Sequence, residues 1–340
     1  MSRTTLLAGA AALALPLLSA DPVGKGHDLT PKFSEGQELT IRSEVIATFG
    51  LDDATAQMGE MEMIPEVPTV DVEVEAINEV HETILSVRDG QLAKLRRTHV
   101  EEGFSATGEA GMQGQFQDFD ESQEGPMQGR TFELTKTEDG WDTEDVTEDA
   151  DSLDDVGEMV LALTNEKTHW EQLLPSRPVE VGGTWDVGAE MMEEMQRAMS
   201  VMASQDSEMA PLMGIVESLQ ENMEFEAKGK LVSVDDGMAK IEWNLEAELI
   251  IDDLFAIIRE VMDPDMMGEL PESAEGSLEL AMEMTGDGVF DLSLHQLVES
   301  SLEGEFALAG EFALSEQGME IQASADASGT MEINTSITVE

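Results

Sequence analysis

The chain has 340 residues, with 74 acidic against 17 basic side chains, a net charge of −57 at pH 7 and no cysteine. A field of that sign repels phosphate backbones and anionic membranes, which disfavours nucleic-acid binding and docking on membranes. The absence of cysteine excludes disulfides, thiolate nucleophiles and cysteine-based zinc or iron–sulfur sites. Disorder is the competing interpretation of such charge, but the 41% hydrophobic content follows regular periods that indicate packed cores.

The first twenty residues predict a secretory signal peptide that is cleaved after Ala20. Arg3 precedes an apolar run from Leu6 to Leu18, which Ser19 and Ala20 close. A membrane anchor is the alternative, but the run is shorter than the roughly 20 apolar residues that a spanning helix needs. We therefore expect an exported protein, periplasmic or extracellular, that is soluble after cleavage. Its charge favours a saline or divalent-rich setting, because dissolved ions screen the self-repulsion.

Alternation of apolar and polar residues dominates the rest of the chain and predicts antiparallel β-strands. The pattern is clearest from Ile241 to Leu249 and recurs in segments that begin at Leu278, Met319 and Met331. The expected fold class is mainly β (α+β), with two tandem related antiparallel sheets or half-barrel repeats and a few amphipathic helices on one face. Turns are expected at Asp235-Asp236-Gly237, Gly286-Asp287-Gly288, Gln317-Gly318 and Ser328-Gly329.

Comparing the chain with itself predicts an internal duplication. Ser86 to Leu95 is similar to Ser233 to Ile241, with one residue inserted in the first copy. Any hairpin favours Asp-Gly at its turn, which explains each match singly but not a common spacing. The other landmarks at this offset are Gly36 with Gly182, Gly129 with Gly276, and Glu138-Asp139-Gly140 with Gly286-Asp287-Gly288.

This pattern divides the chain into a signal peptide (1–20), a first β repeat (21–150), a linker helix (151–165) and a second β repeat (166–340). The second repeat is expected to hold a helical insertion at 189–221 and a C-terminal meander. A further helix is expected after Asp252 and Asp253, with Leu254, Ile257 and Ile258 on one face. Residues 51–68, rich in Met and Glu, are expected to form a loop or flap.

The string from Leu174 to Trp185 reads Leu-Pro-Ser-Arg-Pro-Val-Glu-Val-Gly-Gly-Thr-Trp. It resembles the Leu-Pro-x-x-Pro-Val-x-Val-Gly-x-x-Trp signature of uncharacterised secreted bacterial proteins of planctomycete type, which carry a domain of unknown function. Val234 to Ile241 is similar to a Val-x-x-Gly-x-Ala-x-Ile hairpin of the same proteins. The resemblance implies an exported β-rich protein, but it implies no particular activity. In layout the chain also resembles the half-barrels of lipoprotein carriers, at the level of fold alone.

Within this string we expect Gly182 and Gly183 to form a tight turn, and Trp185 to anchor the following strand in the core. An exposed Trp185 that stacks on a ligand is the alternative.

No motif indicates catalysis, so we predict that the chain is not an enzyme and needs no cofactor. The histidines are His27, His81, His99, His169 and His295, and none shows the spacing of two ligands on one helix face. Nucleophile-elbow, phosphate-loop and dinucleotide motifs are absent from the sequence. Paired carboxylates cannot be recognised among so many acidic residues, which leaves a hydrolase open.

Methionine is the second compositional feature, with 23 residues in the chain. The cluster at helical spacing suits an adaptable apolar face on the sheet or on a flexible ligand. Thioether ligands for Cu(I) are the alternative, but no His or Cys accompanies the cluster. The candidate ligand-binding residues are Met192, Met195, Met199, Met202 and Trp243.

The sequence is compatible with two functions. The first is an exported, non-catalytic binding protein that holds a lipid or other apolar ligand in a concave sheet under the methionine-rich helix. The second is an acidic structural or cell-surface interaction protein associated with cations. The acidic run from Glu138 to Asp155 allows weak Ca²⁺ binding but lacks an ordered calcium-loop motif, so a solvated loop is favoured.

Overall fold

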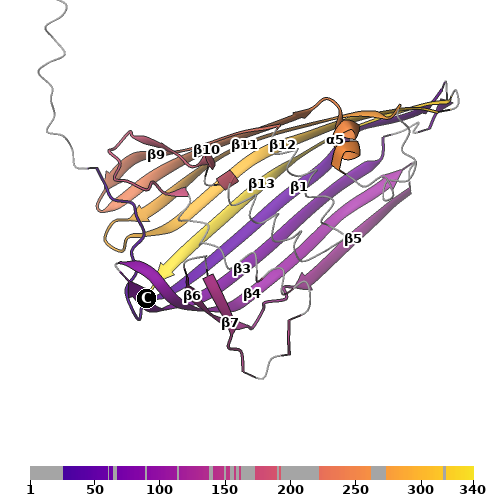
Figure 1. Ribbon diagram of the computed structural model, residues 1–340. Coiled ribbons are helices and arrows are strands. Elements are labelled where there is room, and N and C mark those ends of the chain that lie inside the picture. Colours follow the sequence, from indigo (N-terminus) through magenta and orange to yellow (C-terminus); the bar gives the residue numbers. More distant parts are fainter. Residues whose placement is uncertain are drawn as a thin grey trace, which may run out of the picture.

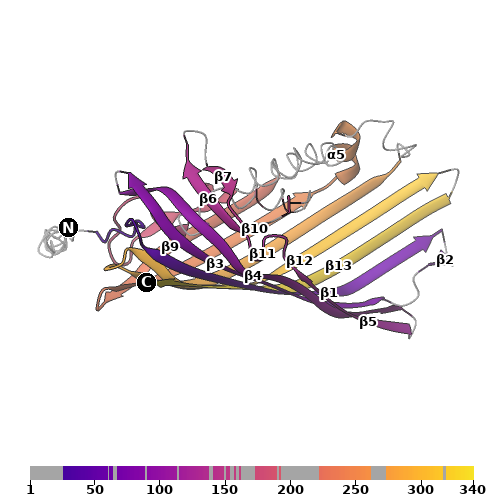
Figure 2. The ribbon, with the colours of Figure 1, turned by 90° about the horizontal axis from the view of Figure 1, so that it is seen from below.

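The computed structural model describes residues 26–340, except 60, 64–66, 89, 113–114, 138–140, 149–150, 154–156, 158–160, 162–172, 190, 193–221, 262–272 and 317–318. The fold is mainly β, and a single antiparallel sheet of 13 strands makes up almost all of it. Figures 1 and 2 show one broad, twisted and curved sheet that stays open. The strand order is β7-β6-β4-β3-β1-β13-β12-β11-β10-β9-β8, with β2 paired to β1 and β5 paired to β4.

Many of the strands are long. Their bounds are β1 (Glu38–Met58), β2 (Met61–Glu62), β3 (Thr69–Arg88), β4 (Gln91–Met112), β5 (Gln115–Glu124), β6 (Thr131–Lys136), β7 (Trp141–Asp145), β8 (Thr184–Asp186), β9 (Met223–Asp235), β10 (Met238–Ile251), β11 (Glu275–Asp291), β12 (Gln296–Glu316) and β13 (Met319–Val339). The α-helix α5 (Leu254–Val261) follows β10.

The sheet has an apolar face and a polar face. Directly paired residues of antiparallel strands point to the same side, and neighbours along a strand point to opposite sides. One row across β10 to β1 consists of Trp243, Gly286, Leu302, Ile333 and Val45 and defines the apolar face. The row one residue further, at Asn244, Thr285, Glu303 and Glu332, defines the polar face. The predicted alternation from Ile241 to Leu249 is thus confirmed.

Two hydrophobic cores cover the apolar face at one end of the sheet, which we call the proximal end. It carries the hairpin tips at Gly90 and Gly237 and the C-terminus (Figure 1). The first core surrounds Ile241, Trp243 and Phe290, and the second surrounds Ile84 and Phe132. The opposite end, where β1 and β12 finish, is called the distal end.

Several expected turns are wrong. Gly286-Asp287-Gly288 lies inside β11 and Ser328-Gly329 inside β13, so both segments continue as strands. A Cβ at Gly288 would overlap the ring of Trp243, and one at Gly329 would overlap the ring of Phe306. Glycine is therefore present there to admit an aromatic ring from a neighbouring strand, not to reverse the chain. Gln317-Gly318 lies outside the described residues.

Other local predictions are confirmed. Asp236 and Gly237 have φ values of 50° and 85° at the β9–β10 turn, as a hairpin of this type requires. The helix after Asp253 is α5, and the Asp253 carboxylate caps it by accepting a hydrogen bond from the Ala256 amide at 2.8 Å. The flap expected at residues 51–68 is wrong in part, because residues 51–58 continue β1 and residues 61–62 form β2.

The two hairpins singled out by self-comparison share local geometry. Gly36 and Gly182 have φ values of 80° and 83°, and their amides donate to the carbonyls of Ile84 and Leu231. Both hairpins also have a register shift directly after these carbonyl-bearing residues, between Ile84 and Ser86 in the first and between Leu231 and Ser233 in the second. The inserted residue of the first copy is a second bulge between Leu92 and Lys94.

The remaining landmarks of the duplication fail. Gly129 occupies a turn with a φ of 77°, whereas Gly276 lies in β11 and the Gly286–Gly288 segment is in mid-strand. Glu138-Asp139-Gly140 lies outside the described residues. The two halves of the chain nevertheless occupy separate parts of the sheet. In the strand order, β7, β6, β4, β3 and β1 lie on one side of β13, and β12, β11, β10, β9 and β8 lie on the other. The duplication itself stays a prediction.

Most of the other expected helices, and the signal peptide, lie outside the described residues. Of the linker helix the structure describes helical conformation at Gly157 and Leu161, and of the insertion it describes Gly188, Ala189, Met191 and Met192 as helical. Among the described residues, no helix has the length and apolar composition to cross a membrane.

Candidate functional site

The apolar face continues beyond the two cores into the distal half of the sheet. Its first row in this region crosses six strands from β10 to β3 and consists of Ala247, Met282, Phe306, Gly329, Phe49 and Val72. The next row, from β10 to β1, consists of Leu249, Leu280, Leu308, Ala327 and Leu51. Strand register therefore brings residues from both halves of the chain into one continuous apolar surface.

Much of this surface is only half-buried. Phe49 is 37% exposed, and Phe306, Leu308 and Phe312 are of intermediate exposure. At the distal end α5 packs on the surface through Phe255, whose ring centroid lies 5.4 Å from that of Phe312. Exposed methionines, Met61 at 62% and Met63 at 54%, follow the end of β1.

A polar row separates the second core from the exposed apolar surface, whereas the first core extends beyond this row to Leu245. The row crosses the sheet through Ser300, Thr335, Ser43, Asn78 and Glu102. The hydroxyls of Ser43 and Thr335 lie 3.1 Å apart. Next to the row is a cavity of about 360 Å³ lined by Val45, Ala76 and Phe104 as well as by Asn78 and Glu102.

Glu102 is the residue of this row that sequence reasoning missed. Burial raises the pKa of its carboxyl group, against the opposing effect of the hydrogen bond that it accepts from the Met127 amide at 2.9 Å. A carboxyl group with a perturbed pKa beside a cavity is a typical feature of a binding site. Glu102 had no signal in the sequence, because it is one of many acidic residues and its burial depends on a loop that starts 23 residues later, at Gly125.

The polar face carries an acidic depression of about 1060 Å³ in the same distal half. Its lining includes the row of Phe49 and both rows of the polar face that flank it, but not the next apolar rows, at Ala47 and Leu51. The flanking side chains therefore place the depression on the polar side. Among the described residues, no Lys or Arg lines it. The carboxylates that do so are Asp52, Asp71, Glu73, Glu109, Asp118, Glu283 and Glu305.

Lysine side chains on the polar face gather at the proximal end, around a smaller depression of about 560 Å³. There Lys228 contacts Glu226 at 2.5 Å, Lys230 contacts Glu242 at 3.5 Å and Lys240 contacts Asp287 at 3.4 Å. Each of these lysines is thus balanced by a carboxylate, so the depression is not a cationic site.

The candidate ligand-binding residues are not brought together by the described structure. Trp243 is 2% exposed and its indole N–H donates to the carbonyl of Leu173 at 3.1 Å, so it belongs to the core rather than to a ligand-contacting surface. Met192 is half-buried, and its neighbour Met191 packs against the first core. Met195, Met199 and Met202 lie outside the described residues.

Trp185 anchors its strand as expected. It packs against the first core, and its indole N–H donates to the same Leu173 carbonyl at 3.0 Å. Trp185 lies over Gly229, where a Cβ would overlap the ring. The alternative of an exposed, ligand-stacking Trp185 is not supported by these contacts.

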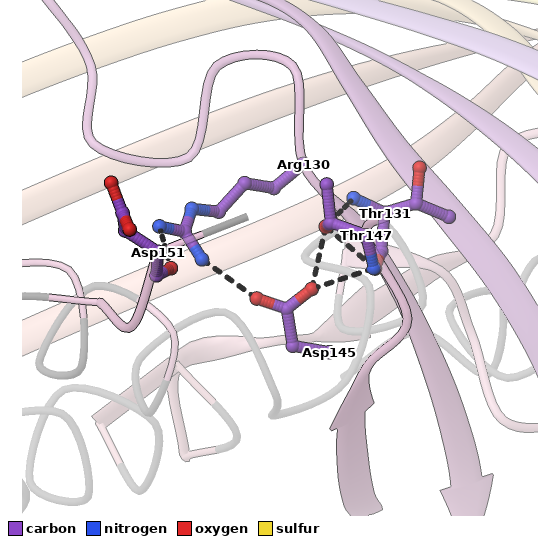
Figure 3. A network of polar contacts seen from close by, with 5 residues as sticks. All are labelled: Arg130, Thr131, Asp145, Thr147 and Asp151. Carbon is purple, nitrogen blue, oxygen red and sulfur yellow. Dashed lines mark hydrogen bonds and ion pairs between the residues drawn. The ribbon is translucent and has the colours of Figure 1, made fainter. Parts of the chain in front are cut away.

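The middle of the acidic run takes part in a local hydrogen-bond network (Figure 3). Arg130 donates to the Asp145 carboxylate at 2.7 Å and to the Asp151 carbonyl at 2.7 Å. The Thr147 amide and hydroxyl donate to the other Asp145 oxygen at 2.9 and 2.5 Å. Burial raises the pKa of Asp145, but the hydrogen bonds from Thr147 and Arg130 outweigh this effect and lower the pKa. Asp145 is therefore committed to a structural role.

The described residues contain no group of three or more His, Asp or Glu side chains arranged to hold a metal ion. His99 is buried, and its Nδ1 has no hydrogen-bond partner among the residues that the structure describes. Together these features define the chain as an open antiparallel sheet with one apolar and one strongly acidic face.

Comparison with known proteins places the chain in no family. No family model matches the sequence, and no curated protein matches it. A solved structure of a FadL homologue from Pseudomonas aeruginosa aligns with 90% of this chain and 92% of its own at 6% identity and a TM-score of 0.19. OccK7 (OpdD) from the same organism aligns with 89% and 99% at 7% identity and a TM-score of 0.17. TM-scores this low support no inference about the chain.

Proposed function

We propose that the protein is an exported, non-catalytic binding protein that holds an apolar or amphiphilic ligand against the distal apolar face of its sheet. The observation that supports this most is the run of half-buried apolar residues across β11, β12, β13 and β1. Soluble proteins rarely expose contiguous apolar surface of this kind unless it binds something. A wide sheet face bounded by the polar row at Ser43 and Glu102 suits a ligand with an apolar body and a polar end.

Dye binding tests this proposal directly. An uncharged naphthylamine dye should become fluorescent on the folded protein, and native mass spectrometry after gentle purification should reveal co-purified amphiphile. Phe49→Asp places a charge on the apolar face and should weaken dye binding by roughly tenfold. Ala307→Asp introduces the same side chain at an exposed position of the polar face and should leave dye binding unchanged. Equal binding by both variants, or no dye binding by the native protein, would contradict the proposal.

The acidic depression favours a second candidate, an interaction protein whose polar face meets cations or basic partners. Because no described residue of its lining is basic and seven are acidic, the depression concentrates positive counterions. Thermal melts separate diffuse from specific binding: NaCl should raise the midpoint, and Ca²⁺ should raise it no further than NaCl of equal ionic strength. A larger rise with Ca²⁺ would point instead to discrete calcium sites.

A further inference from the structure

Positive charge is segregated along the strands. Eight strand segments in the distal half of the sheet contain no Lys or Arg, whereas each of them contains Asp or Glu. They are 45–58 of β1, 69–76 of β3, 104–112 of β4, 115–124 of β5, 243–251 of β10, 275–286 of β11, 302–316 of β12 and 319–333 of β13. Lys228 of β9 pairs with Asn244 and contacts Glu226, at the start of the distal half. The other basic residues of the long strands lie towards the proximal end, at Arg42, Arg88, Lys94, Arg96, Arg97, Lys230 and Lys240.

The half-exposed apolar surface occupies this same acidic half. Exposed carboxylates border the surface at Asp252, before α5, and at Glu121 of β5, which pairs with Ala106 on the apolar side of the sheet. The helix α5 brings one cation, Arg259, but its guanidinium is used in donating to the carbonyls of Phe255 and Ala274 at 3.0 and 2.6 Å. The apolar surface therefore lies in a negative field, which repels anionic amphiphiles and attracts cationic ones.

The dimensions of the surface favour a polypeptide over a single acyl chain. At about 3.3 Å per residue and 4.8 Å between strands, the face from Ala47 to Met58 over β11, β12, β13 and β1 measures about 36 by 19 Å. That is roughly 700 Å², close to the approximately 800 Å² that each partner contributes to a standard protein interface. The exposed Met61 and Met63 add adaptable apolar side chains at its distal end.

We propose that the distal apolar face binds a cationic amphipathic helix of another polypeptide. The apolar side of the helix packs on the rows around Phe49 and Phe306, and its Lys and Arg side chains meet the bordering carboxylates. This proposal rests on the proposed function and specifies the charge and class of its ligand.

Three model peptides of about 18 residues, roughly five helical turns, test the proposal on the full-length protein at 0.15 M NaCl. A Lys/Leu amphipathic peptide should bind at least tenfold more tightly than a Glu/Leu peptide of the same pattern. It should also bind at least tenfold more tightly than a Lys/Ser peptide of equal charge, and its affinity should fall as NaCl rises. Equal binding of the Lys/Leu peptide and either control peptide would overturn the proposal.

Matched variants locate the surface. Phe49→Ser combined with Met61→Ser should weaken Lys/Leu binding by roughly tenfold, and so should Glu121→Gln combined with Asp252→Asn. The controls are Ala307→Ser on the polar face, and Glu180→Gln with Asp235→Asn, which removes two exposed charges at the proximal end. Loss of binding in the controls, or none in the test variants once circular dichroism shows them folded, would place the peptide elsewhere and contradict the proposal.

The dye experiment distinguishes failure of the cationic-helix proposal from failure of the proposed function. If the uncharged dye binds but the Lys/Leu peptide binds no better than the Glu/Leu peptide, only the cationic helix is ruled out. If neither the dye nor the Lys/Leu peptide binds, the proposed function fails as well. Tighter binding to uncharged phosphatidylcholine vesicles than to the peptide would identify a lipid surface as the occupant and overturn the polypeptide proposal.

Discussion

The rings of Phe49 and Phe306 stack across the backbone of Gly329, with centroids 6.5 Å apart and planes within 15° of parallel. The two residues are 257 positions apart in the chain and meet only because β13 lies between β1 and β12. A Cβ at Gly329 would overlap both the Phe306 ring and the Thr48 carbonyl. Glycine at this position is therefore required by the packing of the apolar face.

The first prediction concerns that packing. Gly329→Ala should lower the free energy of unfolding by about 1–3 kcal/mol, because the new methyl group forces the ring or a strand to move. Gly310→Ala is the matched control on β12, since its nearest neighbour would be 3.7 Å away. The control should be neutral or stabilise by up to about 1 kcal/mol. Urea denaturation measures both, and equal effects would contradict this account of Gly329.

The second prediction concerns the carbonyl of Leu173, which accepts hydrogen bonds from both Trp185 and Trp243. In Trp185→Phe or Trp243→Phe the carbonyl keeps one donor, but the double variant leaves it with neither indole. The double variant should therefore cost about 1 kcal/mol more than the sum of the single variants. Phe132→Leu in the other core, combined with Trp243→Phe, should be additive. Additivity in the Trp pair would show that the shared carbonyl does not couple them.

The third prediction concerns pH. Burial, with a smaller contribution from the charge of Arg97, lowers the pKa of His99 from 6.5 to about 4. Between pH 6.5 and pH 4 His99 is protonated in the unfolded chain but stays neutral in the folded protein. The stability attributable to neutral His99 is therefore complete above pH 6.5 and is lost as the pH falls towards 4. This loss amounts to about 3 kcal/mol at most.

His99→Leu should flatten that part of the pH dependence. The measurement is the unfolding free energy of the native protein and the variant at pH 7 and at pH 4.5, compared as a difference of differences. A pH dependence that is unchanged in His99→Leu would rule out His99 as its source.

The fourth prediction concerns the extra residue of the first hairpin. Ala93 is the bulged residue between the pairs Val87–Leu92 and Ser86–Lys94, whereas Val234–Ala239 and Ser233–Lys240 follow each other without a gap. Deleting Ala93 should therefore restore a regular hairpin and change the stability by less than about 1 kcal/mol.

Deleting Ala239 is the matched control. It shifts the following residues of β10, including Trp243, to the opposite face, and should prevent folding. Circular dichroism and thermal melts distinguish the outcomes. A folded Ala239 deletion, or an unfolded Ala93 deletion, would contradict the assigned register.

The sequence by itself determined the fold class, because period-two alternation is a local property of each strand. It also located the Asp236-Gly237 turn and the cap of α5 at Asp253, since both depend on a few consecutive residues. The signal peptide and the duplication stay predictions of the sequence.

Only the tertiary structure decided which glycines turn the chain. Gly237 has no heavy atom near the position of a Cβ, whereas Gly288 lies beneath Trp243, and both read as turn residues in the sequence. The same non-local pairing buried Trp243 and raised the pKa of Glu102. It also joined Phe49 to Phe306 in one apolar surface. These features depend on which strands become neighbours, and that is set by pairing between segments far apart in the chain, which local periodicity does not encode.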